Sequence, residues 1–272
     1  MPSRDVGEFG DIGIVGAGRF GTYFAGQLER VGHRVHLADA LDTPPGRDRA
    51  LARACASSIV IYAVPIRALE RAILDTRDML TPGALVLDVC SVKVMPCALL
   101  GRLLQGVAAV GTHPLFGPQS APVSCAGQRV AVCPIIGGNA PAEPAATAAG
   151  TAVGEAAAAR AARLFGTLGL EIVRCTPAEH DAQVARTQFL THFIGRGAMR
   201  AGVGRLPLST KSHDALMDIV EVVGTDSIEL FEDMAAFNPM VRGVRAEFLA
   251  ALRAIDEQLA AQEQSLGHGD AR

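Results

Sequence analysis

The chain has 272 residues and a formal net charge of −3, because 25 Lys and Arg side chains stand against 28 Asp and Glu side chains. Hydrophobic residues make up 49% and charged residues 19% of the chain, which excludes a disordered or collagen-like protein and a small disulfide-held fold. The slightly acidic balance offers no overall positive field, so neither nucleic acid nor a membrane surface is expected as a partner.

The six cysteines are scattered without a CxxC pair, which favours reduced thiols over a disulfide framework. Residues 1–10 are polar and lack the apolar core of a secretion signal, and no apolar run approaches the ~18 residues that a membrane span needs. We therefore expect a cytoplasmic protein. The histidines and cysteines show no metal-ligand spacing, so no catalytic metal is predicted.

Strands and helices alternate along the first part of the chain. The sequence predicts strands at 12–15, 33–39, 58–64, 84–90 and 107–111, helices at 19–31, 66–79 and 92–104, and a loop at 43–49. The runs 129–133 and 170–174 predict two strands at the edge of the same sheet, with an Ala-rich helix at 155–168 between them and a surface loop at 134–151. This order is typical of an α/β protein with a Rossmann-type, mostly parallel sheet.

Beyond Thr176 the pattern is helical throughout, with helices predicted at 177–202, 212–223, 226–237 and 241–265. We therefore predict a dinucleotide-binding domain over 9–175 and an all-helical domain over 176–272. In the last helix, apolar side chains recur at three- and four-residue steps and form one face that must find a partner. That face consists of Val244, Phe248, Leu252, Ile255 and Leu259.

The first motif is the G-x-G-x-x-G run at 16–21, placed directly after a strand and at the start of a helix. Glycines there permit a tight turn and a close backbone approach, so that a pyrophosphate can rest on the amides of the helix N-terminus. The predicted cofactor-binding residues of this loop are Gly16, Gly18, Arg19, Phe20 and Gly21.

Asp39, at the end of the second strand, can accept hydrogen bonds from both ribose hydroxyls and would repel a 2′-phosphate, which favours NAD over NADP. The alternatives are that Asp39 only caps a turn, or that Arg47 or Arg49 reaches a phosphate, so NADP remains possible. Val64 and Pro65, at the end of the third strand, are expected to belong to the same cofactor site.

Two more motifs lie at the ends of the fourth and fifth strands, at 88–93 (DVCSVK) and 111–118 (GTHPLFGP). The carboxyl ends of the strands form the ligand crevice of an open α/β sheet, so both motifs should face the reactive end of the cofactor. A histidine can accept a proton near working pH, and His113 is the candidate for that role.

Together with 179–181 (EHD), 188–196 (QFLTHFIGR) and 226–231 (DSIELF), these motifs resemble the prephenate/arogenate dehydrogenase family, and most closely its plant-type arogenate members. The resemblance implies an oxidative decarboxylation of a cyclohexadienyl substrate, in which hydride leaves C4 for the nicotinamide and the ring carboxylate departs as CO2. Arogenate would give tyrosine, and prephenate would give 4-hydroxyphenylpyruvate. The resemblance also implies a homodimer through the helical domain.

The same resemblance assigns roles to single residues. His113 would accept the C4 hydroxyl proton, and Ser91 would hydrogen-bond this histidine beside the nicotinamide; the alternative for Ser91, compatible with this role, is a helix N-cap. His192 would bind substrate from one helical face shared with Gln188 and Arg196, its alternative being a core histidine. His180 we expect to be structural.

The chain departs from many prephenate-type relatives at Glu221, which stands six residues before Ser227 where they carry a substrate-binding arginine. An acidic residue there can pair with the α-amino group of arogenate, so arogenate is favoured over prephenate. Alternatively, Glu221 is an exposed helix position. The substrate carboxylates still need a cation, for which Lys211 and Arg196 are candidates, and an amino-substituted prephenate stays an alternative substrate.

Two other functions fit parts of the sequence. A β-hydroxyacid or 6-phosphogluconate-type dehydrogenase shares the two-domain plan but calls for a catalytic lysine on a helix of the second domain, whereas Lys211 follows a loop-like segment. A non-catalytic dinucleotide sensor needs the Gly-rich loop but has no use for the converging Ser91, His113 and His192.

Overall fold

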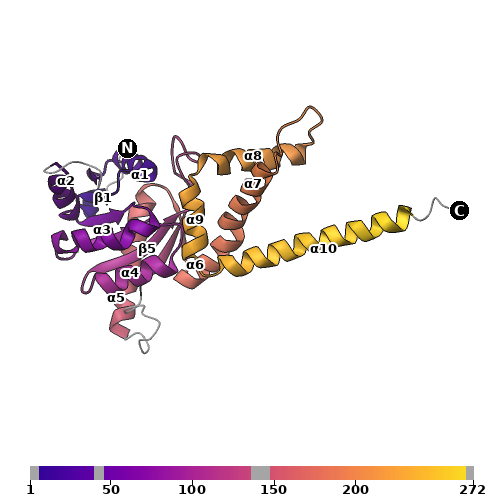
Figure 1. Ribbon diagram of the computed structural model, residues 1–272. Helices are drawn as coiled ribbons and strands as arrows, with labels where there is room; N and C mark the ends of the chain where they lie inside the picture. Colours follow the sequence, from indigo (N-terminus) through magenta and orange to yellow (C-terminus); the bar gives the residue numbers. More distant parts are fainter. Residues whose placement is uncertain (1–5, 40–45, 136–147, 268–272) are drawn as a thin grey trace.

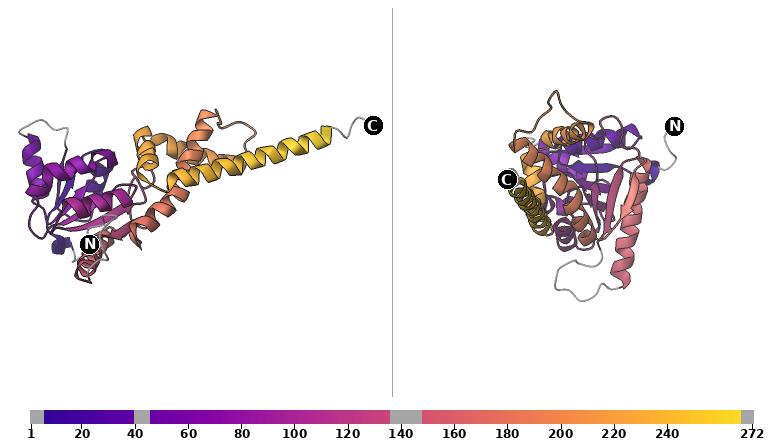
Figure 2. Two further views of the ribbon diagram at one scale, coloured as in Figure 1. Left: turned by 60° about the horizontal axis from the view of Figure 1, so that its bottom comes forward. Right: turned by 90° about the vertical axis from the view of Figure 1, so that its right-hand side faces the viewer.

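The computed structural model describes residues 6–39, 46–135 and 148–267. A sheet enclosed by helices forms the first part of the molecule, and a group of helices packs beside it (Figure 1). From that group the last helix extends away as a long arm, which is seen from two further directions in Figure 2.

Seven strands form one sheet in the order β2-β1-β3-β4-β5-β6-β7. The first five strands are mutually parallel, β6 runs antiparallel to β5, and β7 is parallel to β6. The predicted α/β fold with a mostly parallel sheet is therefore confirmed. The strands are β1 (Ile12–Val15), β2 (Val35–Ala38), β3 (Ile59–Tyr62), β4 (Leu85–Asp88), β5 (Ala108–Pro114), β6 (Arg129–Pro134) and β7 (Glu171–Arg174).

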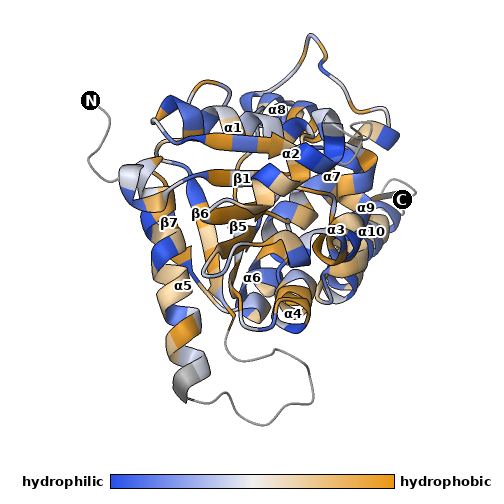
Figure 3. Ribbon diagram, turned by 90° about the vertical axis from the view of Figure 1, so that its left-hand side faces the viewer, coloured by the Kyte–Doolittle hydropathy of each residue, from blue (hydrophilic) through white to orange (hydrophobic). Residues whose placement is uncertain are grey.

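Helices cover both faces of the sheet, as the continuous apolar runs of its central strands require. Ile59 and Ile61 of β3 face a core shared with α1 and α5, whereas Val60 and Tyr62 face the opposite core, shared with α2, α3 and α4. The strands at the centre are largely orange in the hydropathy colouring of Figure 3. The helices are α1 (Arg19–Arg30), α2 (Gly46–Cys55), α3 (Leu69–Thr76), α4 (Val94–Leu103) and α5 (Ala148–Thr167).

Two segments predicted as loops are helical. Helix α2 begins at Gly46, within the expected loop 43–49. It buries only Ala54 and Cys55, and for this reason its Arg-rich sequence shows little apolar periodicity from which a helix could be predicted. Helix α5 begins at Ala148, within the expected loop 134–151, because a run of alanines can form a helix without a patterned face. The remaining parts of both predicted loops, 43–45 and 136–147, lie outside the described residues.

Gly13, in the middle of β1, allows α2 to approach the sheet closely. A Cβ atom at this position would lie 1.9 Å from the carbonyl oxygen of Ala54, a distance that no real side chain tolerates. The close packing of α2 against β1 therefore requires a residue without a side chain at position 13.

The chain after β7 is helical, as predicted. The helices are α6 (Pro177–Val184), α7 (Leu190–Arg200), α8 (Lys211–Thr225), α9 (Ile228–Phe237) and α10 (Val241–Gly267). A π-helical turn, η4 (Ala185–Phe189), joins α6 to α7 without a break. The core of this part is small and aromatic, with Phe189 stacked on Phe193 and Phe231. Within the described residues, no helix is both long and apolar enough to cross a membrane.

Three polar contacts join the helices to the sheet. Arg67, which follows β3, donates through Nε and Nη2 to Oδ1 of the buried Asp233 on α9, at 2.8 and 2.5 Å. Arg19 Nη1, in the Gly-rich loop, donates to the carbonyl of Thr225 at the end of α8 (2.8 Å). Asn238 Nδ2 donates to the carbonyl of Asp181 (2.8 Å).

We predict that Gly13→Ala destabilises the protein by about 1–3 kcal/mol, because the new methyl group must push α2 away from β1. Gly26→Ala is the matched control: Gly26 lies in the interior of α1 with open space around its Cα, so alanine there should stabilise by about 0.5–1 kcal/mol. Denaturant unfolding measures both values. Equal effects of the two substitutions would contradict the close approach at Gly13.

Candidate active site

The Gly-rich loop connects the carboxyl end of β1 to α1 and has the geometry of a phosphate cradle. Gly16 has a φ of +115°, and a Cβ there would lie 2.5 Å from the carbonyl oxygen of Ala63. A Cβ on Gly21 would lie 1.9 Å from the carbonyl oxygen of Gly16. Gly18 is the N-cap of α1 and provides no side-chain hydrogen bond, so the first amides of α1 stay available for an anion.

An open hollow of about 600 Å³ adjoins this loop. Its wall consists of Ala17, Gly18, Arg19, Thr22, Tyr23, Pro118 and Gln119. Phe20, in the first turn of α1, packs against the core instead and stacks on Phe24 at 5.4 Å. The glycine cradle, the free helix N-terminus and the hollow together fit a dinucleotide.

The other predicted cofactor residues lie at the same edge of the sheet. Asp39 follows the last residue of β2 and is half-buried. Val64 follows β3 and reaches Gly16, where an added Cβ would lie 3.0 Å from Val64 Cγ1. Pro65 is exposed next to it. All of these residues therefore border the carboxyl ends of β1, β2 and β3.

A buried ion pair fixes the ends of β4 and β5. Lys93 and Asp88 have no exposed side-chain surface, and Lys93 Nζ donates to Asp88 Oδ2. The same ammonium group donates to the carbonyl of Thr112 (2.6 Å), while the Thr112 hydroxyl donates to the carbonyl of Asp88. Burial opposes the charged form of Lys93, but Asp88 keeps its pKa above the ordinary value. The backbone just before His113 is held by this pair.

His113 is buried near the end of β5 and pairs with a second histidine. Its Nδ1 lies 2.9 Å from Nε2 of His180 on α6, and Nδ1 of His180 lies 2.8 Å from Oδ1 of Asp181. Asp181 in turn accepts the backbone N–H groups of Lys93 (2.7 Å) and Val94 (2.9 Å) at the start of α4. Sequence reasoning treated His180 as structural and overlooked Asp181, although the EHD motif contains both.

Burial sets the protonation state of the site histidines. It lowers the pKa of His113 well below the ordinary value, and the positive charges that His180 and Lys93 can carry lower it further. Burial also lowers the pKa of His180, against the opposing hydrogen bond to Asp181. The pKa of His192 falls for the same reason, although Asp226 works in the other direction. All three rings are therefore neutral near pH 7.

The structure differs from the sequence expectation at Ser91. The resemblance implied a hydrogen bond between Ser91 and His113, but His180 holds that ring, and Ser91 Oγ is buried without a hydrogen-bond partner. The alternative role as a helix N-cap is not seen either. Helix α4 begins at Val94, and the Asp181 carboxylate binds its first amides, because α6 packs against the start of α4.

Gln188, His192 and Arg196 lie along the helix that runs through η4 into α7. The π-helical turn contains Gln188, and a single π turn within a helix is frequent at functional sites. His192 Nε2 lies 3.5 Å from Asp226 Oδ2. Arg196 donates to the carbonyls of Asp226 (2.9 Å) and Ser227 (3.0 Å), and its guanidinium carbon stands 5.2 Å from the centre of the Phe231 ring.

The helix carrying these residues is attached to the nucleotide-binding edge at both ends. At one end, His180 and Asp181 contact His113 and α4. At the other, the 225–227 corner that receives Arg196 also receives Arg19 of the Gly-rich loop, through Thr225. The predicted substrate residues Gln188 and His192 therefore lie on a helical run that contacts β5 and α4 at one end and, through the 225–227 corner, the Gly-rich loop at the other.

Buried polar atoms without partners are concentrated among the predicted site residues. Among the described residues, five buried side-chain nitrogen or oxygen atoms lack a hydrogen bond, and four of them belong to predicted site residues. These four are Ser91 Oγ, Gln188 Oε1, His192 Nδ1 and Arg196 Nε. A buried polar atom left without a partner costs about 1–3 kcal/mol, so such a group is expected where a ligand completes the hydrogen bonds.

Two predicted substrate residues are not part of this group. The carboxylate of Glu221 is exposed on α8 and accepts a hydrogen bond from Arg205 Nε (3.0 Å), which fits the alternative of an exposed helix position. Lys211 is exposed at the first residue of α8, after the N-cap Thr210. The described contacts join neither side chain to His113 or His192.

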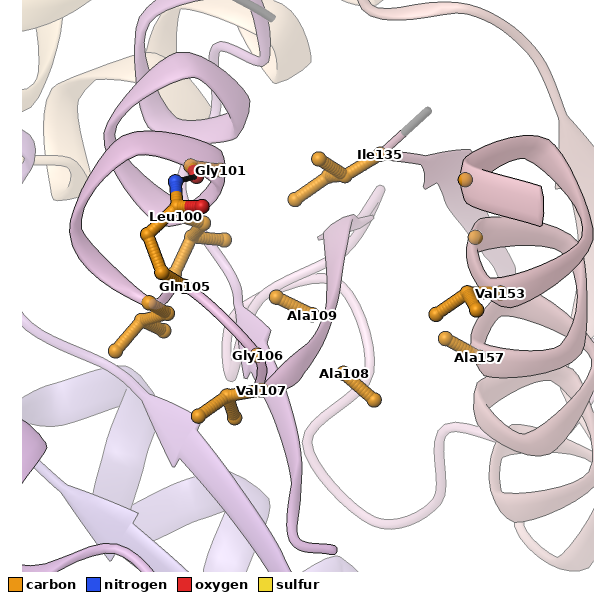
Figure 4. Close-up of a pocket in the computed structure, with 13 residues that line it drawn as sticks. Leu100, Gly101, Gln105, Gly106, Val107, Ala108, Ala109, Ile135, Val153 and Ala157 are labelled. Atoms are coloured by element: carbon orange, nitrogen blue, oxygen red, sulfur yellow. Dashed lines mark hydrogen bonds between the residues drawn. The ribbon is translucent and has the colours of Figure 1, made fainter. Parts of the chain in front are cut away.

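A second hollow, of about 300 Å³, lies at the opposite edge of the sheet, between α4, the start of β5 and α5 (Figure 4). Ile135, Val153 and Ala157 point into it, and its wall contains no ionisable side chain. It therefore offers no group for acid–base chemistry. Nor do the described residues contain three or more His, Cys, Asp or Glu side chains arranged to hold a metal ion.

Comparison with protein families gives two matches. Residues 33–139 match the family described as prephenate dehydrogenase, nucleotide-binding domain. Residues 198–270 match a family described as TYRAAT1-like, C-terminal domain. The first match spans β2 to the segment after β6 and includes both the 88–93 and the 111–118 motifs.

Two named proteins show similarity over most of the chain. Arogenate dehydrogenase 2, chloroplastic, of Arabidopsis thaliana is 28% identical over 239 residues, which are 84% of this chain and 64% of that protein. The 4-amino-4-deoxyprephenate dehydrogenase of Streptomyces pristinaespiralis is 26% identical over 257 residues, 87% of this chain and 80% of that protein. The chain thus spans less than two thirds of the length of the plant relative.

Among solved structures, the fold is similar to prephenate dehydrogenase from A. aeolicus in complex with hydroxyphenyl propionate and NAD+. The TM-score is 0.68 at 18% sequence identity, covering 93% of this chain and 92% of that one. At this identity the similarity concerns the fold alone.

We predict that acidification destabilises the protein through its buried histidines. The pKa values of His33, His113, His180 and His192 are lowered in the fold, whereas in the unfolded chain each returns to about 6.5. Below that pH the unfolded state binds more protons, so stability is greatest above about pH 6.5 and falls as the pH drops toward the folded-state values. The thermal midpoint should fall by at least about 3 °C between about pH 7.5 and 5.5; a constant or rising midpoint would contradict this.

Proposed function

Because the chain belongs to the prephenate/arogenate dehydrogenase family, we propose that it catalyses the oxidative decarboxylation of arogenate, with prephenate as the second candidate substrate and NAD as the hydride acceptor. The similarity to plant arogenate dehydrogenases supports arogenate as the first candidate and prephenate as the second. The similarity to a 4-amino-4-deoxyprephenate dehydrogenase keeps an amino-substituted prephenate as the alternative.

One observation carries the proposal: a buried, neutral histidine at the carboxyl end of the sheet, together with four buried polar atoms that lack partners in the adjoining helix and loop. A non-catalytic sensor has no need of such a group, because unpaired buried atoms lower stability unless a bound molecule completes them. A β-hydroxyacid dehydrogenase would place a lysine in this group, whereas Lys211 is exposed on α8.

The proposed chemistry divides between coenzyme and protein. Bound NAD supplies the two-electron acceptor for C4. His113 accepts the proton of the C4 hydroxyl, which its neutral ring can do and a protonated ring could not. Loss of CO2 then makes the ring aromatic, so the protein's main task is to hold the reacting atoms in position.

The unpartnered atoms supply that positioning. Ser91 Oγ and His192 Nδ1 can each bond to a substrate oxygen, and Gln188 Oε1 can accept from a substrate N–H or O–H. Arg196 Nε is a charged donor that faces no acceptor, so it fits a substrate carboxylate better than the exposed Lys211. The carboxylate of Glu221 would have to give up its hydrogen bond with Arg205 before it could bind the α-amino group of arogenate.

For the coenzyme, the cradle at Gly16, Gly18 and Gly21 would hold the pyrophosphate on the first amides of α1. Asp39 would accept hydrogen bonds from the ribose hydroxyls, which supports NAD over NADP. We assign dinucleotide binding to residues 9–175, and substrate binding and dimerisation to residues 176–272.

The activity test crosses arogenate, prephenate, 4-amino-4-deoxyprephenate and a β-hydroxyacid with NAD and NADP, and follows the reduced nicotinamide. We expect turnover of arogenate with NAD, and we expect His113→Asn to lower kcat by about 10²–10⁴-fold. Calorimetric NAD affinity should stay within about threefold, because His113 does not contact the pyrophosphate cradle. NAD binding by the wild type without turnover of any of the four substrates would instead indicate a sensor.

We also propose that α10 forms a homodimer. Val244 is buried and Phe248 meets Phe193 edge-on at 6.4 Å, but further along the same face Leu252, Ile255 and Leu259 are 47%, 54% and 54% exposed. This part of the helix extends away from the rest of the molecule (Figures 1 and 2). A helix without packing partners is marginal in water, so a second copy of the same face is the natural cover.

We expect sedimentation velocity to give a dimer for the wild type and a monomer for the triple variant Leu252→Lys, Ile255→Lys, Leu259→Lys. The matched control replaces Arg253 and Glu257 by Gln on the opposite face of α10 and should leave the dimer intact. A monomeric wild type, or a triple variant that remains dimeric, would refute this arrangement.

A further inference from the structure

Three side chains form a continuous hydrogen-bonded series from the start of α4 to His113. Asp181 bonds His180 at 2.8 Å, and His180 bonds His113 at 2.9 Å. All three are buried, with 0%, 3% and 4% of their surface exposed. Water therefore cannot replace any of these hydrogen-bond partners. Each of the bonded ring nitrogens must donate where its partner accepts, and accept where its partner donates.

Asp181 fixes the direction of the series. A backbone N–H can only donate, so the bonds from Lys93 N to Oδ1 and from Val94 N to Oδ2 use both carboxylate oxygens as acceptors. The N-terminus of α4 also favours a negative charge at this point. Asp181 therefore has no proton to give, and Nδ1 of His180 must donate to it.

The proton positions of both histidines follow. A neutral His180 that carries its proton on Nδ1 has a lone pair on Nε2, which accepts a hydrogen bond from Nδ1–H of His113. His113 then has no proton on Nε2. Without His180, nothing among the described contacts would select between the two tautomers of His113.

We propose that His180 and Asp181 are positioning residues of the reaction: Asp181 orients His180, and His180 holds the proton of His113 on Nδ1, so that Nε2 is the atom that accepts the substrate proton. This inference rests on the proposed function, because it assigns the atom of His113 that acts in it. It replaces the structural role expected for His180 from sequence.

The proton transfer balances within this arrangement. The O–H bond of the C4 hydroxyl breaks, and its proton forms a bond to Nε2 of His113, which becomes an imidazolium. His180 stays neutral and accepts the stronger hydrogen bond from Nδ1–H, and Asp181 supplies the opposing charge beyond it. The other charges that act on these rings are those of Lys93, the N-cap residue of α4, and Asp88 on β4, which pair with each other.

The test uses two replacements of His180 that differ in one property. Phenylalanine fills the space of the ring without any acceptor, whereas glutamine offers an amide oxygen near the position of Nε2. We expect His180→Phe to lower kcat by about 10²-fold and to change KM by less than about threefold. The kcat of His180→Gln should be at least about tenfold higher than that of His180→Phe. Equal kcat in the two variants, or no loss in either, would overturn the proposal.

A second measurement reads the tautomer directly and needs no turnover. Nitrogen NMR of the protein labelled in its histidines distinguishes an Nδ1–H ring from an Nε2–H ring, and the His113 signals are those that disappear in His113→Asn. We expect His113 and His180 to be Nδ1–H tautomers in the wild type, and His113 to lose this preference in His180→Phe. An Nε2–H tautomer of His113 in the wild type overturns the proposal, even if His180→Phe does not fold.

His33→Phe is the control, because His33 is also buried and also has one ring bond, to Thr167 at 2.8 Å, but lies outside the site. It should lower the thermal midpoint without changing kcat or the His113 signals. If the wild type turns over neither arogenate nor prephenate while His113 shows the expected tautomer, the proposed function fails and the positioning role in that reaction fails with it, whereas the proton positions assigned to His113 and His180 stand. Turnover by a wild type whose His113 carries its proton on Nε2 overturns the positioning role and leaves the proposed function intact.

Discussion

The carboxylate of Asp181 is the contact on which the geometry of the site depends. Its two oxygens bind the first amides of α4 and the ring of His180, and its backbone carbonyl receives Asn238 from the turn between α9 and α10. One buried residue thus joins the sheet, the first helix after the sheet and the base of the long terminal helix. Lys93, whose backbone N–H binds Asp181, uses its ammonium group to bind Asp88 and the carbonyl of Thr112, and so holds the strand end that carries His113.

Most of the sheet could be predicted from the sequence, because a strand buried on both faces is a continuous apolar run and such runs are easily distinguished from amphipathic helices. Helix α2 was missed because it buries only two small residues and has a charged outer surface. The π-helical turn at Ala185–Phe189 was also missed, since the 177–202 segment has ordinary helical spacing, and nothing in that spacing indicates a wider turn.

The position of a site residue was predictable where a chemically informative residue stands at the end of a predicted strand, as for the Gly-rich loop and His113. The geometry was not predictable where a site side chain pairs with a partner distant in sequence. The bond between His113 and His180 spans 67 positions, and the cap that Asp181 places on α4 spans 88. Ser91 directly precedes the helix predicted at 92–104, which suggested a role as its cap, but α4 begins at Val94 and the carboxylate of Asp181 on α6 binds its first amides. Glu221 could be assigned by counting residues, yet only the fold shows that Arg205 faces it.

The unbroken run of α6, η4 and α7 is held near its two ends by contacts that differ in burial. Its first turns contact β5 and α4 through the buried His180 and Asp181. Near its far end, Arg196 contacts the 225–227 corner, which also receives the exposed guanidinium of Arg19 from the Gly-rich loop. A change that breaks the solvent-exposed bond of Arg19 would therefore leave the buried bond between His113 and His180 in place.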